Sequence, residues 1–445
     1  MFQPDIETLP QAKLRDLQTE RLKNLVRYVY ERVPFYKNAL DEKGVEPSDI
    51  TSVDDITKLP ITRKTDLRDG YPTGLFAVPM SEVARIHASS GTTGRPTIVG
   101  YTKRDLETFA EVNARCLAAA GAEPGMVFHN AYGYGLFTGG LGLHYGGERL
   151  GLTVIPVSGG MTERQITLIQ DLQPQVISCT PSYAQTLAEA MREKGIAPEE
   201  TSLEFAVLGA EPWTDAIRAD VEAGLGVEAT NIYGLSEVIG PGVSNEDVNE
   251  QAGAYIWEDH FYPEILHPET GEPVGEGEDG VLVITTLTKE ALPLLRYWTG
   301  DITHVRRDVG ASGRTHARMG MIKGRSDDMI IVRGVNLYPT QIEEVLQRVP
   351  DVAMHYQLAL YRRGTLDTCE LRLELSQDAF YRLGQEVLDE ELLETNQYLS
   401  DLRGKVQRQI KDTVGVNVKV NLLAPGSAPR SAGGKLRRIV DERNL

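Results

Sequence analysis

A short segment rich in hydroxyl groups and glycine is the part of this sequence best suited to binding phosphate. It reads Ala88-Ser-Ser-Gly-Thr-Thr-Gly-Arg-Pro-Thr97 and follows an apolar run at residues 83–86. Gly91 and Gly94 let backbone N–H groups converge on an anion, and the hydroxyls add neutral donors. Neither the GxxxxGK[ST] motif nor a strand-borne GxGxxG is present. The segment therefore predicts a phosphate-binding loop of another kind, with a polar surface loop as the alternative.

Four further motifs follow this loop in order along the chain. They are Tyr233-Gly-Leu-Ser-Glu237, Tyr297-Trp-Thr-Gly-Asp301, Gly324-Arg-Ser-Asp-Asp328 and Gly433-Gly-Lys435. Together with the loop they resemble the signature of the adenylate-forming acyl-CoA synthetase superfamily. Segments 132–140, 209–213, 257–265 and 333–340 are similar to those of the phenylacetate–CoA ligases, and the length of 445 residues suits that branch.

This resemblance implies a two-step reaction with ATP and coenzyme A as co-substrates and Mg²⁺ as a cofactor. A carboxylate first attacks the α-phosphate of ATP and expels pyrophosphate. The thiol of coenzyme A then displaces AMP from the acyl-adenylate. Positioning and cations lower the barrier of the first step, because charge builds on the α-phosphoryl oxygens.

The resemblance also assigns roles to individual residues. Lys435 would be the catalytic cation of the first step, although a solvated basic tail is the alternative. Glu237 would be catalytic as the ligand of Mg²⁺, and Asp301 would bind the ribose hydroxyls, with a surface turn as its alternative. The implied nucleotide-binding residues are Ser89, Ser90, Gly91, Thr92, Thr93, Gly94, Gly209, Ala210, Glu211, Pro212, Asn231, Ile232, Tyr233, Gly234, Ser236, Asp301 and Arg325.

For the acyl group, the resemblance points to a pocket of aromatic and small residues. Its implied members are Tyr134, Phe137, Gly139, Ala210 and Pro241. Such a slot suits an aryl ring, which would stack on the aromatic side chains, although these side chains could be ordinary core or loop residues. Phenylacetate is the first choice, and a substituted benzoate or indoleacetate remains open. Asp327 is the implied hinge, with Asp328 as the alternative.

Several other candidate sites are weaker. Residues 257–260 with Glu264 could bind a metal, yet related ligases often have a cysteine where this chain has Asp247, which puts a structural metal in doubt. His87 is expected to pack or form a hydrogen bond beneath the loop, because the attacking carboxylate needs no base near neutral pH. Cys116 and Cys179 stand in apolar contexts typical of inert buried thiols.

Short apolar runs and amphipathic stretches predict the elements that position these residues. A helix is expected at residues 14–33 from apolar residues at three- and four-residue spacing. Between residues 83 and 235, strands at 152–156, 176–179 and 205–208 alternate with helices at 163–172 and 183–193. This alternation predicts βαβ units with helices on both faces of a largely parallel sheet. Residues 255–305 are strand-rich, with a strand at 280–286.

A smaller α+β unit is expected beyond residue 325. It comprises a strand at 329–332, a helix at 339–349, strands at 357–361 and 370–375, a helix at 402–414 and a last strand at 417–423. The predicted fold is therefore α/β: a large domain at 1–326, with parallel sheets flanked by helices and a β-rich subdomain, and a small mobile α+β domain at 327–445.

Composition limits the partners and location. The 46 basic and 64 acidic residues give a net charge of −18, which disfavours nucleic acid and anionic membranes. With three separated cysteines, no apolar run near membrane length and a polar amino terminus, a cytoplasmic location is expected. The resemblance suggests a homodimer. An AMP-transferring enzyme similar to coenzyme F390 synthetases and a non-catalytic AMP-binding module are the rival functions.

Overall fold

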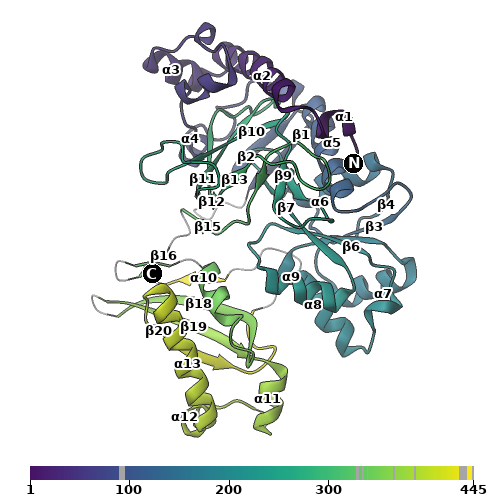
Figure 1. Cartoon of the computed structure of the whole chain (residues 1–445), viewed down its shortest axis with the longest axis vertical. Helices are drawn as coiled ribbons and strands as arrows, with labels where there is room; N and C mark the ends of the chain where they lie inside the picture. The colour runs from purple at the N-terminus through teal and green to yellow at the C-terminus, as the bar shows by residue number, and fades with distance from the viewer. Residues whose placement is uncertain are drawn as a thin grey trace.

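The computed structural model describes residues 1–89, 96–326, 330–332, 335–337, 339–363, 366–384, 387–429 and 438–442. They form a large amino-terminal α/β domain and a smaller carboxy-terminal domain, which lies below it in Figure 1. This is the predicted architecture. Among the helices of the described residues, none combines the length and the apolar character needed to cross a membrane.

The first 82 residues are helical and pack on the outside of the large domain. The helix predicted at 14–33 is confirmed as α2 (Gln11–Arg32), whose inward face buries Leu22, Val26 and Val29. Gly44 ends the next helix with a φ of +66°, a conformation that glycine adopts without strain. The other elements here are α1 (Pro4–Glu7), α3 (Pro34–Lys43), η1 (Pro47–Asp49), η2 (Val53–Lys58), α4 (Lys64–Asp69) and η3 (Met80–Glu82).

A nine-stranded mixed sheet forms the centre of the large domain, in the order β13-β14-β9-β8-β7-β6-β5-β3-β4. The strands from β7 to β4 are parallel, as predicted, and the remaining ones are antiparallel. The strand bounds are β3 (Val127–Asn130), β4 (Thr153–Ile155), β5 (Val176–Cys179), β6 (Phe205–Gly209), β7 (Glu228–Leu235), β8 (Gly240–Glu246), β9 (Ala254–Ile256), β13 (Val305–Arg306) and β14 (Arg318–Met319).

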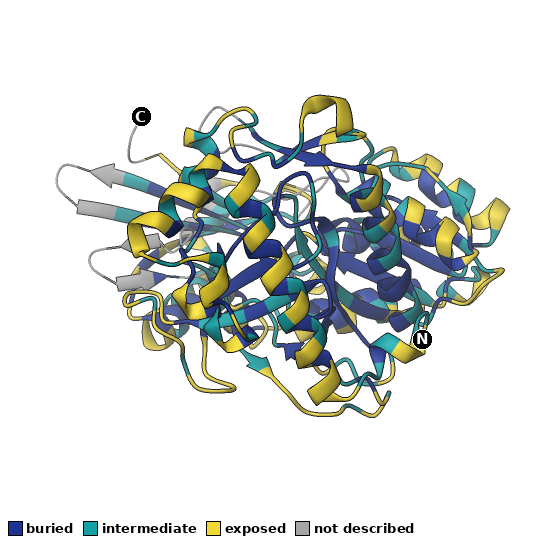
Figure 2. Ribbon diagram, turned by 90° about the horizontal axis from the view of Figure 1, so that it is seen from above, coloured by how far each residue is buried: buried dark blue, intermediate teal, exposed yellow. Residues whose placement is uncertain are grey.

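Helices cover both faces of this sheet, as the βαβ pattern predicts. Alternate strand residues point to opposite faces. Val176 packs in one core with residues of α5 (Lys103–Ala119) and α6 (Gly139–Leu150), whereas Ile177 packs in another with α7 (Thr162–Leu172), α8 (Pro181–Glu193) and α9 (Asp215–Leu225). A short helix, η4 (Pro198–Glu200), precedes β6. Figure 2 shows buried strands surrounded by helices whose outer faces are exposed.

Two smaller antiparallel sheets complete the large domain. One pairs β1 (Arg85–Ser89) with β2 (Thr97–Tyr101). The other has the order β10-β11-β12-β15 and confirms the strand-rich region; its members are β10 (Phe261–Leu266), β11 (Gly280–Thr286), β12 (Tyr297–Thr303) and β15 (Gly324–Arg325). All seven residues of β11 are buried, as expected for a continuous apolar run.

The small domain packs helices on a four-stranded sheet of order β20-β19-β18-β21. Its elements are β16 (Ile330–Val332), β17 (Val335–Leu337), α10 (Pro339–Leu346), β18 (Val352–Arg363), β19 (Leu366–Leu375), α11 (Gln377–Leu383), α12 (Glu390–Thr395), α13 (Gln397–Val414), β20 (Val418–Leu423) and β21 (Ile439–Asp441). The prediction that residues 417–423 form the last strand is wrong, because β21 follows and pairs in parallel with β18. Helices α11 and α12 were also not predicted.

A buried ion-pair network joins the amino terminus to the large domain. The Arg314 guanidinium donates to Glu7 Oε2 at 2.7 Å and also contacts Asp247 Oδ2. All three side chains are at most 4% exposed. Asp247 therefore faces a cation of the chain itself rather than a free cavity.

Arg314→Ala should strongly destabilise the large domain, because it leaves two buried carboxylates without their cation. We expect the free energy of unfolding to fall by about 3–5 kcal/mol. Urea unfolding followed by tryptophan fluorescence measures this, since Trp213, Trp257 and Trp298 all lie in the large domain.

Lys37→Ala is the matched control. It removes an exposed ion pair with Asp41 on α3 and should cost about 0–1 kcal/mol. Similar small losses for both variants would show that the buried network contributes nothing to stability.

Candidate active site

The predicted site residues gather at one edge of the nine-stranded sheet. The parallel strands β3, β6 and β7 end at Asn130, Gly209 and Leu235, and the chain that follows each of them carries predicted site residues. The carboxyl ends of parallel strands lie at the same edge of a sheet, where α/β folds bind their ligands. The structure therefore brings together the predicted acyl segment and two of the nucleotide segments.

The segment 209–212 makes a sharp turn after β6. A Cβ atom on Gly209 would lie 2.2 Å from the carbonyl oxygen of Ile232, so only glycine fits there. Ala210 follows with a φ of +69° in the left-handed region. The Glu211 carboxylate then accepts a hydrogen bond from the backbone N–H of Ser182 at 3.3 Å, at the start of α8. Pro212 is exposed.

The end of β7 is fixed by side chains from neighbouring elements. Trp213 Nε1 donates to Asn231 Oδ1 at 3.0 Å, and the Asn231 backbone N–H donates to Glu246 Oε2 at 2.8 Å. A Cβ atom on Gly234 would lie only 1.8 Å from the Gly240 carbonyl oxygen. β7 and β8 therefore approach each other closely where the nucleotide segment begins.

Asp301 receives hydrogen bonds from two other predicted residues. The Tyr233 hydroxyl donates to Asp301 Oδ2 at 2.7 Å, and Arg325 Nη1 donates to Asp301 Oδ1 at 2.9 Å. Arg325 Nη2 also donates to the Thr299 carbonyl at 3.2 Å. Burial and the charge of Asp301 raise the pKa of Tyr233, so the phenol remains a donor. A carboxylate has about four acceptor positions, so Asp301 can accept hydrogen bonds from several donors at once.

Ser236 and Glu237 lie in the turn at residues 236–239, between β7 and β8. Glu237 Oε1 is 3.7 Å from Lys64 Nζ on α4, and its side chain is 6% exposed. The Ser236 hydroxyl is 3.3 Å from the Thr138 hydroxyl, which ties the turn to the acyl segment. A single carboxylate beside a hydroxyl is an oxygen donor set that suits Mg²⁺, whose other ligands are phosphate oxygens and water.

The predicted acyl residues are only partly brought together. Gly139 begins α6, and Pro241 pairs with Gly234 between β7 and β8. Tyr134 is half-buried, whereas Phe137 is 56% exposed. Phe137 therefore presents its ring to solvent, and its contact with an acyl group stays a prediction.

Asn130 is a buried residue of this site that the sequence analysis missed. Its Nδ2 donates to the Gly140 carbonyl and to the Tyr134 hydroxyl, both at 2.8 Å, and its Oδ1 accepts from the Ser178 hydroxyl at 3.0 Å. The Tyr134 hydroxyl, 3.1 Å from His144 Nδ1, can donate to that nitrogen. A polar residue that closes an apolar run was the only signal in the sequence.

Lys289 is a second missed residue, and its ammonium group is buried beside the 236–239 turn. Its Nζ donates to the Val238 carbonyl at 3.1 Å and lies 4.0 Å from the centre of the Tyr101 ring. Burial lowers the pKa of Lys289 to about 8, although the charges of Asp105 and Glu237 oppose this shift. Nothing in its local sequence distinguishes it from a surface lysine.

The strand before the predicted phosphate loop contacts the acyl segment. Both the Ala88 backbone N–H and His87 Nδ1 donate to the Leu136 carbonyl, at 2.9 and 3.1 Å. His87 is buried, which lowers its pKa, and it packs and forms a hydrogen bond as expected. Ser89 ends β1. The other predicted residues Ser90, Gly91, Thr92, Thr93, Gly94, Asp327 and Lys435 lie outside the described residues.

The candidate metal segment is occupied by ion pairs. Within the described residues, Glu111, Asp259 and His260 have ligand atoms within 4.8 Å of one another. However, Arg115 donates to Asp259 at 2.7 Å and to Glu111 at 2.8 Å. Glu264 instead pairs with Arg296 at 2.8 Å. The arginines already neutralise the carboxylates that a metal would need.

The two thiols predicted to be inert are buried. Burial raises the pKa of Cys116 to about 12, and it also raises the pKa of Cys179.

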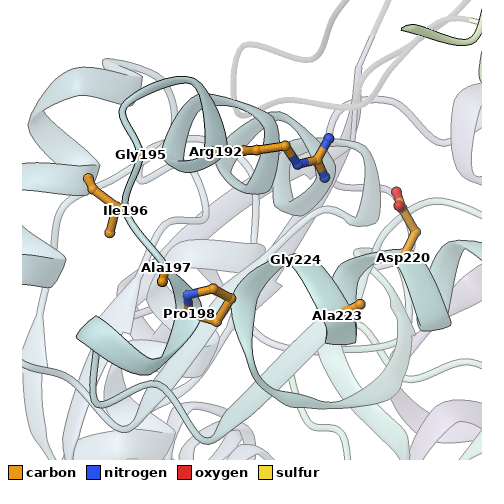
Figure 3. Close-up of a pocket in the computed structure, with 8 residues that line it drawn as sticks. All are labelled: Arg192, Gly195, Ile196, Ala197, Pro198, Asp220, Ala223 and Gly224. Atoms are coloured by element: carbon orange, nitrogen blue, oxygen red, sulfur yellow. The ribbon is translucent and has the colours of Figure 1, made fainter. Parts of the chain in front are cut away.

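A surface hollow lies apart from the site. The hollow, about 320 Å³ in volume, lies beside the carboxyl-terminal ends of α8 and α9 and includes Arg192 and Asp220 (Figure 3). A helix of 13 residues is ~20 Å long, so this hollow is far from Ser182 at the other end of α8.

Comparison with known proteins agrees with this geometry. The family model described as AMP-binding enzyme matches residues 7–288, and the model of the AMP-binding enzyme C-terminal domain matches residues 334–443. The chain belongs to the AMP-binding enzyme family. A phenylacetate-coenzyme A ligase from Thermus thermophilus is 66% identical over 443 residues, covering 100% of both chains.

Two crystal structures of a 2-hydroxyisobutyryl-CoA ligase are similar over 99% of this chain and 92% of theirs. The structure in the postadenylation state has a TM-score of 0.89 at 29% identity. The one in the thioesterification state has a TM-score of 0.72 at 30% identity. The arrangement of the present chain is therefore closer to the postadenylation structure of the relative than to its thioesterification structure.

The ion pairs around Glu111 predict a pH dependence of stability. Burial alone would raise the pKa of Glu111, but the hydrogen bond with His260 and the charge of Arg115 lower it from 4.5 to about 2. A carboxyl whose folded pKa is lowered stabilises the protein above the unfolded pKa and loses this effect as the pH falls. The difference in unfolding free energy between wild type and Glu111→Gln should therefore shrink between pH 4.5 and about 2.

Urea unfolding across this pH range measures the difference, and EDTA provides the control. Because arginines neutralise the cluster, EDTA should leave the unfolding midpoint of the wild type unchanged. A midpoint lowered by EDTA would instead indicate a structural metal at Glu111, Asp259 and His260.

Proposed function

We propose that this chain is a phenylacetate–CoA ligase, which converts phenylacetate, ATP and coenzyme A into phenylacetyl-CoA, AMP and pyrophosphate. The observation that carries the proposal is the convergence of Tyr233, Asp301, Arg325 and Glu237 at the sheet edge that also holds the acyl segment. The family membership and the close similarity to a phenylacetate-coenzyme A ligase support the same reaction.

The nucleotide would lie along the carboxyl ends of β6 and β7. Tyr233 offers a ring for stacking on adenine, and Asp301, held by Arg325, offers acceptors for the two ribose hydroxyls. Segment 209–212 and residues Asn231, Ile232, Gly234 and Ser236 would line the rest of this site. The loop from Ser89 to Gly94 would supply N–H and hydroxyl donors to the phosphates.

Glu237 would hold Mg²⁺ together with the phosphate oxygens of ATP. When bound, the ion neutralises charge on the phosphates. The chain itself must present the carboxylate, and the contacts of the 236–239 turn with Thr138 and Lys289 support that role.

In the first step, a carboxylate oxygen of the acid attacks the α-phosphorus. The bond from this phosphorus to the bridging oxygen breaks, and pyrophosphate leaves with the electron pair. Lys435 would stabilise the charge that develops on the α-phosphoryl oxygens. In the second step, the sulfur of coenzyme A attacks the acyl carbon, and AMP leaves.

The two steps need different groups beside the bond between the acyl carbon and the phosphate of the adenylate, so the small domain would reorient between them. We place the pivot at Asp327 and the domain boundary between residues 326 and 327. The two states in which the relative has been solved, postadenylation and thioesterification, support such a reorientation. A homodimer and a cytoplasmic location complete the proposal, and light scattering tests the first of these.

Lys435→Ala should separate the two half-reactions. Removal of a cation used only while charge develops on the α-phosphate should slow adenylation roughly 100-fold or more. Thioester formation from supplied phenylacetyl-adenylate should be nearly unchanged. Pyrophosphate release and thioester formation are measured separately, and equal losses in both would mean that Lys435 is only structural.

The acyl pocket should select among substrates by their shape, and substitutions at Gly139 test this. The wild type should prefer phenylacetate to acetate in kcat/KM, because a ring buries more apolar area at ~25 cal/mol per Å². The atoms nearest to a Cβ atom at Gly139 would belong to the Tyr132 side chain, the closest at 3.5 Å, so Gly139→Ala should be tolerated. Gly139→Leu should exclude the ring and cost roughly 1–3 kcal/mol in kcat/KM for phenylacetate.

The same assay distinguishes the rival functions. It uses phenylacetate, benzoate, indoleacetate and acetate, with and without coenzyme A. Acetate as the best substrate would contradict the aryl pocket. Pyrophosphate release without thioester formation would indicate an AMP-transferring enzyme, and no release at all would indicate a non-catalytic module.

A further inference from the structure

Lys289 is a buried cation that takes no direct part in either chemical step described above. The residue is 5% exposed, and its Nζ atom has the Val238 carbonyl as hydrogen-bond acceptor and the Tyr101 ring as a second contact. Within the described residues, Lys289 forms no ion pair. Burial of an ammonium group costs several kcal/mol unless its contacts offset the loss of hydration. A methionine would fill the same space at no such cost, so the charge and the donor need an explanation.

The backbone around Lys289 is held firmly by Asp105 of α5. The N–H groups of Glu290 and Ala291 donate to the two oxygens of Asp105 at 2.7 and 2.9 Å. On the other side, the Thr288 hydroxyl is 2.8 Å from His260 Nδ1. Lys289 therefore extends from a fixed backbone and can act as a rigid support.

The element that Lys289 supports is the turn carrying Glu237. Two consecutive carbonyl groups of the 236–239 turn accept hydrogen bonds from the same buried cluster. Lys289 Nζ donates to Val238, and the Tyr101 hydroxyl donates to Ile239 at 2.9 Å. Tyr101 is itself fixed by stacking on Phe109, with ring centres 5.6 Å apart. These two hydrogen bonds hold the backbone immediately after Glu237.

A hydrogen bond from an ammonium group is stronger than one between neutral groups. It is also least exposed to competition from water when it is buried. Loss of this bond would leave the Val238 carbonyl unpaired and free the turn to shift. A shift of about 1 Å is enough to impair a preorganised site.

We propose that Lys289 is a positioning residue that holds the 236–239 turn so that Glu237 presents its carboxylate to the magnesium complex of ATP. The inference rests on the proposed function, because it assigns Glu237 to that ligand. It adds a residue that never touches the substrate and acts through the Val238 carbonyl.

Lys289→Met keeps the length of the side chain and removes the charge and the donor. Calorimetric titration should show about tenfold weaker binding of ATP in the presence of Mg²⁺. Binding of ATP in EDTA should change less than about twofold, because no Mg²⁺ is then present for the Glu237 carboxylate to bind. Thioester formation from supplied phenylacetyl-adenylate should also stay within about twofold, since that step involves no metal-bound triphosphate.

Lys289→Arg and Lys323→Met are the matched controls. Arginine keeps a cation and donors, so it should recover part of the lost affinity for the magnesium complex. Lys323 is exposed and pairs with Asp279, so its substitution should change none of these quantities. Equal losses with and without Mg²⁺, an equal loss of the thioester step, or no change in Lys289→Met would each overturn the proposal.

Tyr101→Phe tests the support of the 236–239 turn if Lys289→Met fails to fold. It removes only the hydroxyl that donates to Ile239 and keeps the ring on which Lys289 lies. We expect about threefold weaker binding of the magnesium complex and unchanged binding of ATP in EDTA; identical changes in both would overturn the proposal. A wild type that binds neither form of ATP would instead refute the proposed function.

Discussion

The carboxylate of Asp301 connects the two sheets between which the candidate site is built. It belongs to β12 of the four-stranded sheet, yet it accepts a hydrogen bond from Tyr233 at the end of β7 in the nine-stranded sheet. Arg325, on the paired strand β15, completes the junction. Without this carboxylate, the Tyr233 hydroxyl and Arg325 Nη1 would lose the acceptor that they share.

The same junction lies directly before the linker to the small domain. Arg325 ends β15, and the Ser326 N–H donates to the Gly300 carbonyl at 2.6 Å, one residue from Asp301. The last described residue of the large domain is therefore fixed to the strand that carries Asp301. A domain that rotates needs a rigid base as much as a free pivot, and here the base is part of the candidate nucleotide site.

Local sequence was sufficient where an element is determined by its own side chains. The bounds of β5 and β11 agree with the predicted strands to the residue, because continuous apolar runs are buried on both faces. β21 was missed because its three residues become a strand only by pairing with β18. Local patterns contain no information about such a distant partner.

The residues of the candidate site divide in the same way, into those that local sequence identifies and those that depend on distant partners. Glu237 and Asp301 belong to motifs that can be recognised in the sequence, whereas Asn130 and Lys289 act through partners elsewhere in the fold. The Lys289 ammonium meets a carbonyl 51 positions earlier in the chain. Buried polar residues of this kind are identified by the hydrogen bonds they make, and those bonds exist only once the sheet has assembled.

The described contacts between the domains include polar ones, beside the packing of Met354 of β18 against the apolar core of α7, α8 and α9. His355 of β18 forms a hydrogen bond with Glu189 of α8 at 2.9 Å. Burial would lower the pKa of Arg438, but the charges of Glu343, Tyr356 and Glu211 raise it. Glu211 belongs to the candidate nucleotide segment, so charge there acts on the small domain. Polar groups regain hydrogen bonds to water when they separate, whereas exposed apolar cores would not. Separation of these polar pairs therefore costs less than exposure of the apolar core of either domain would.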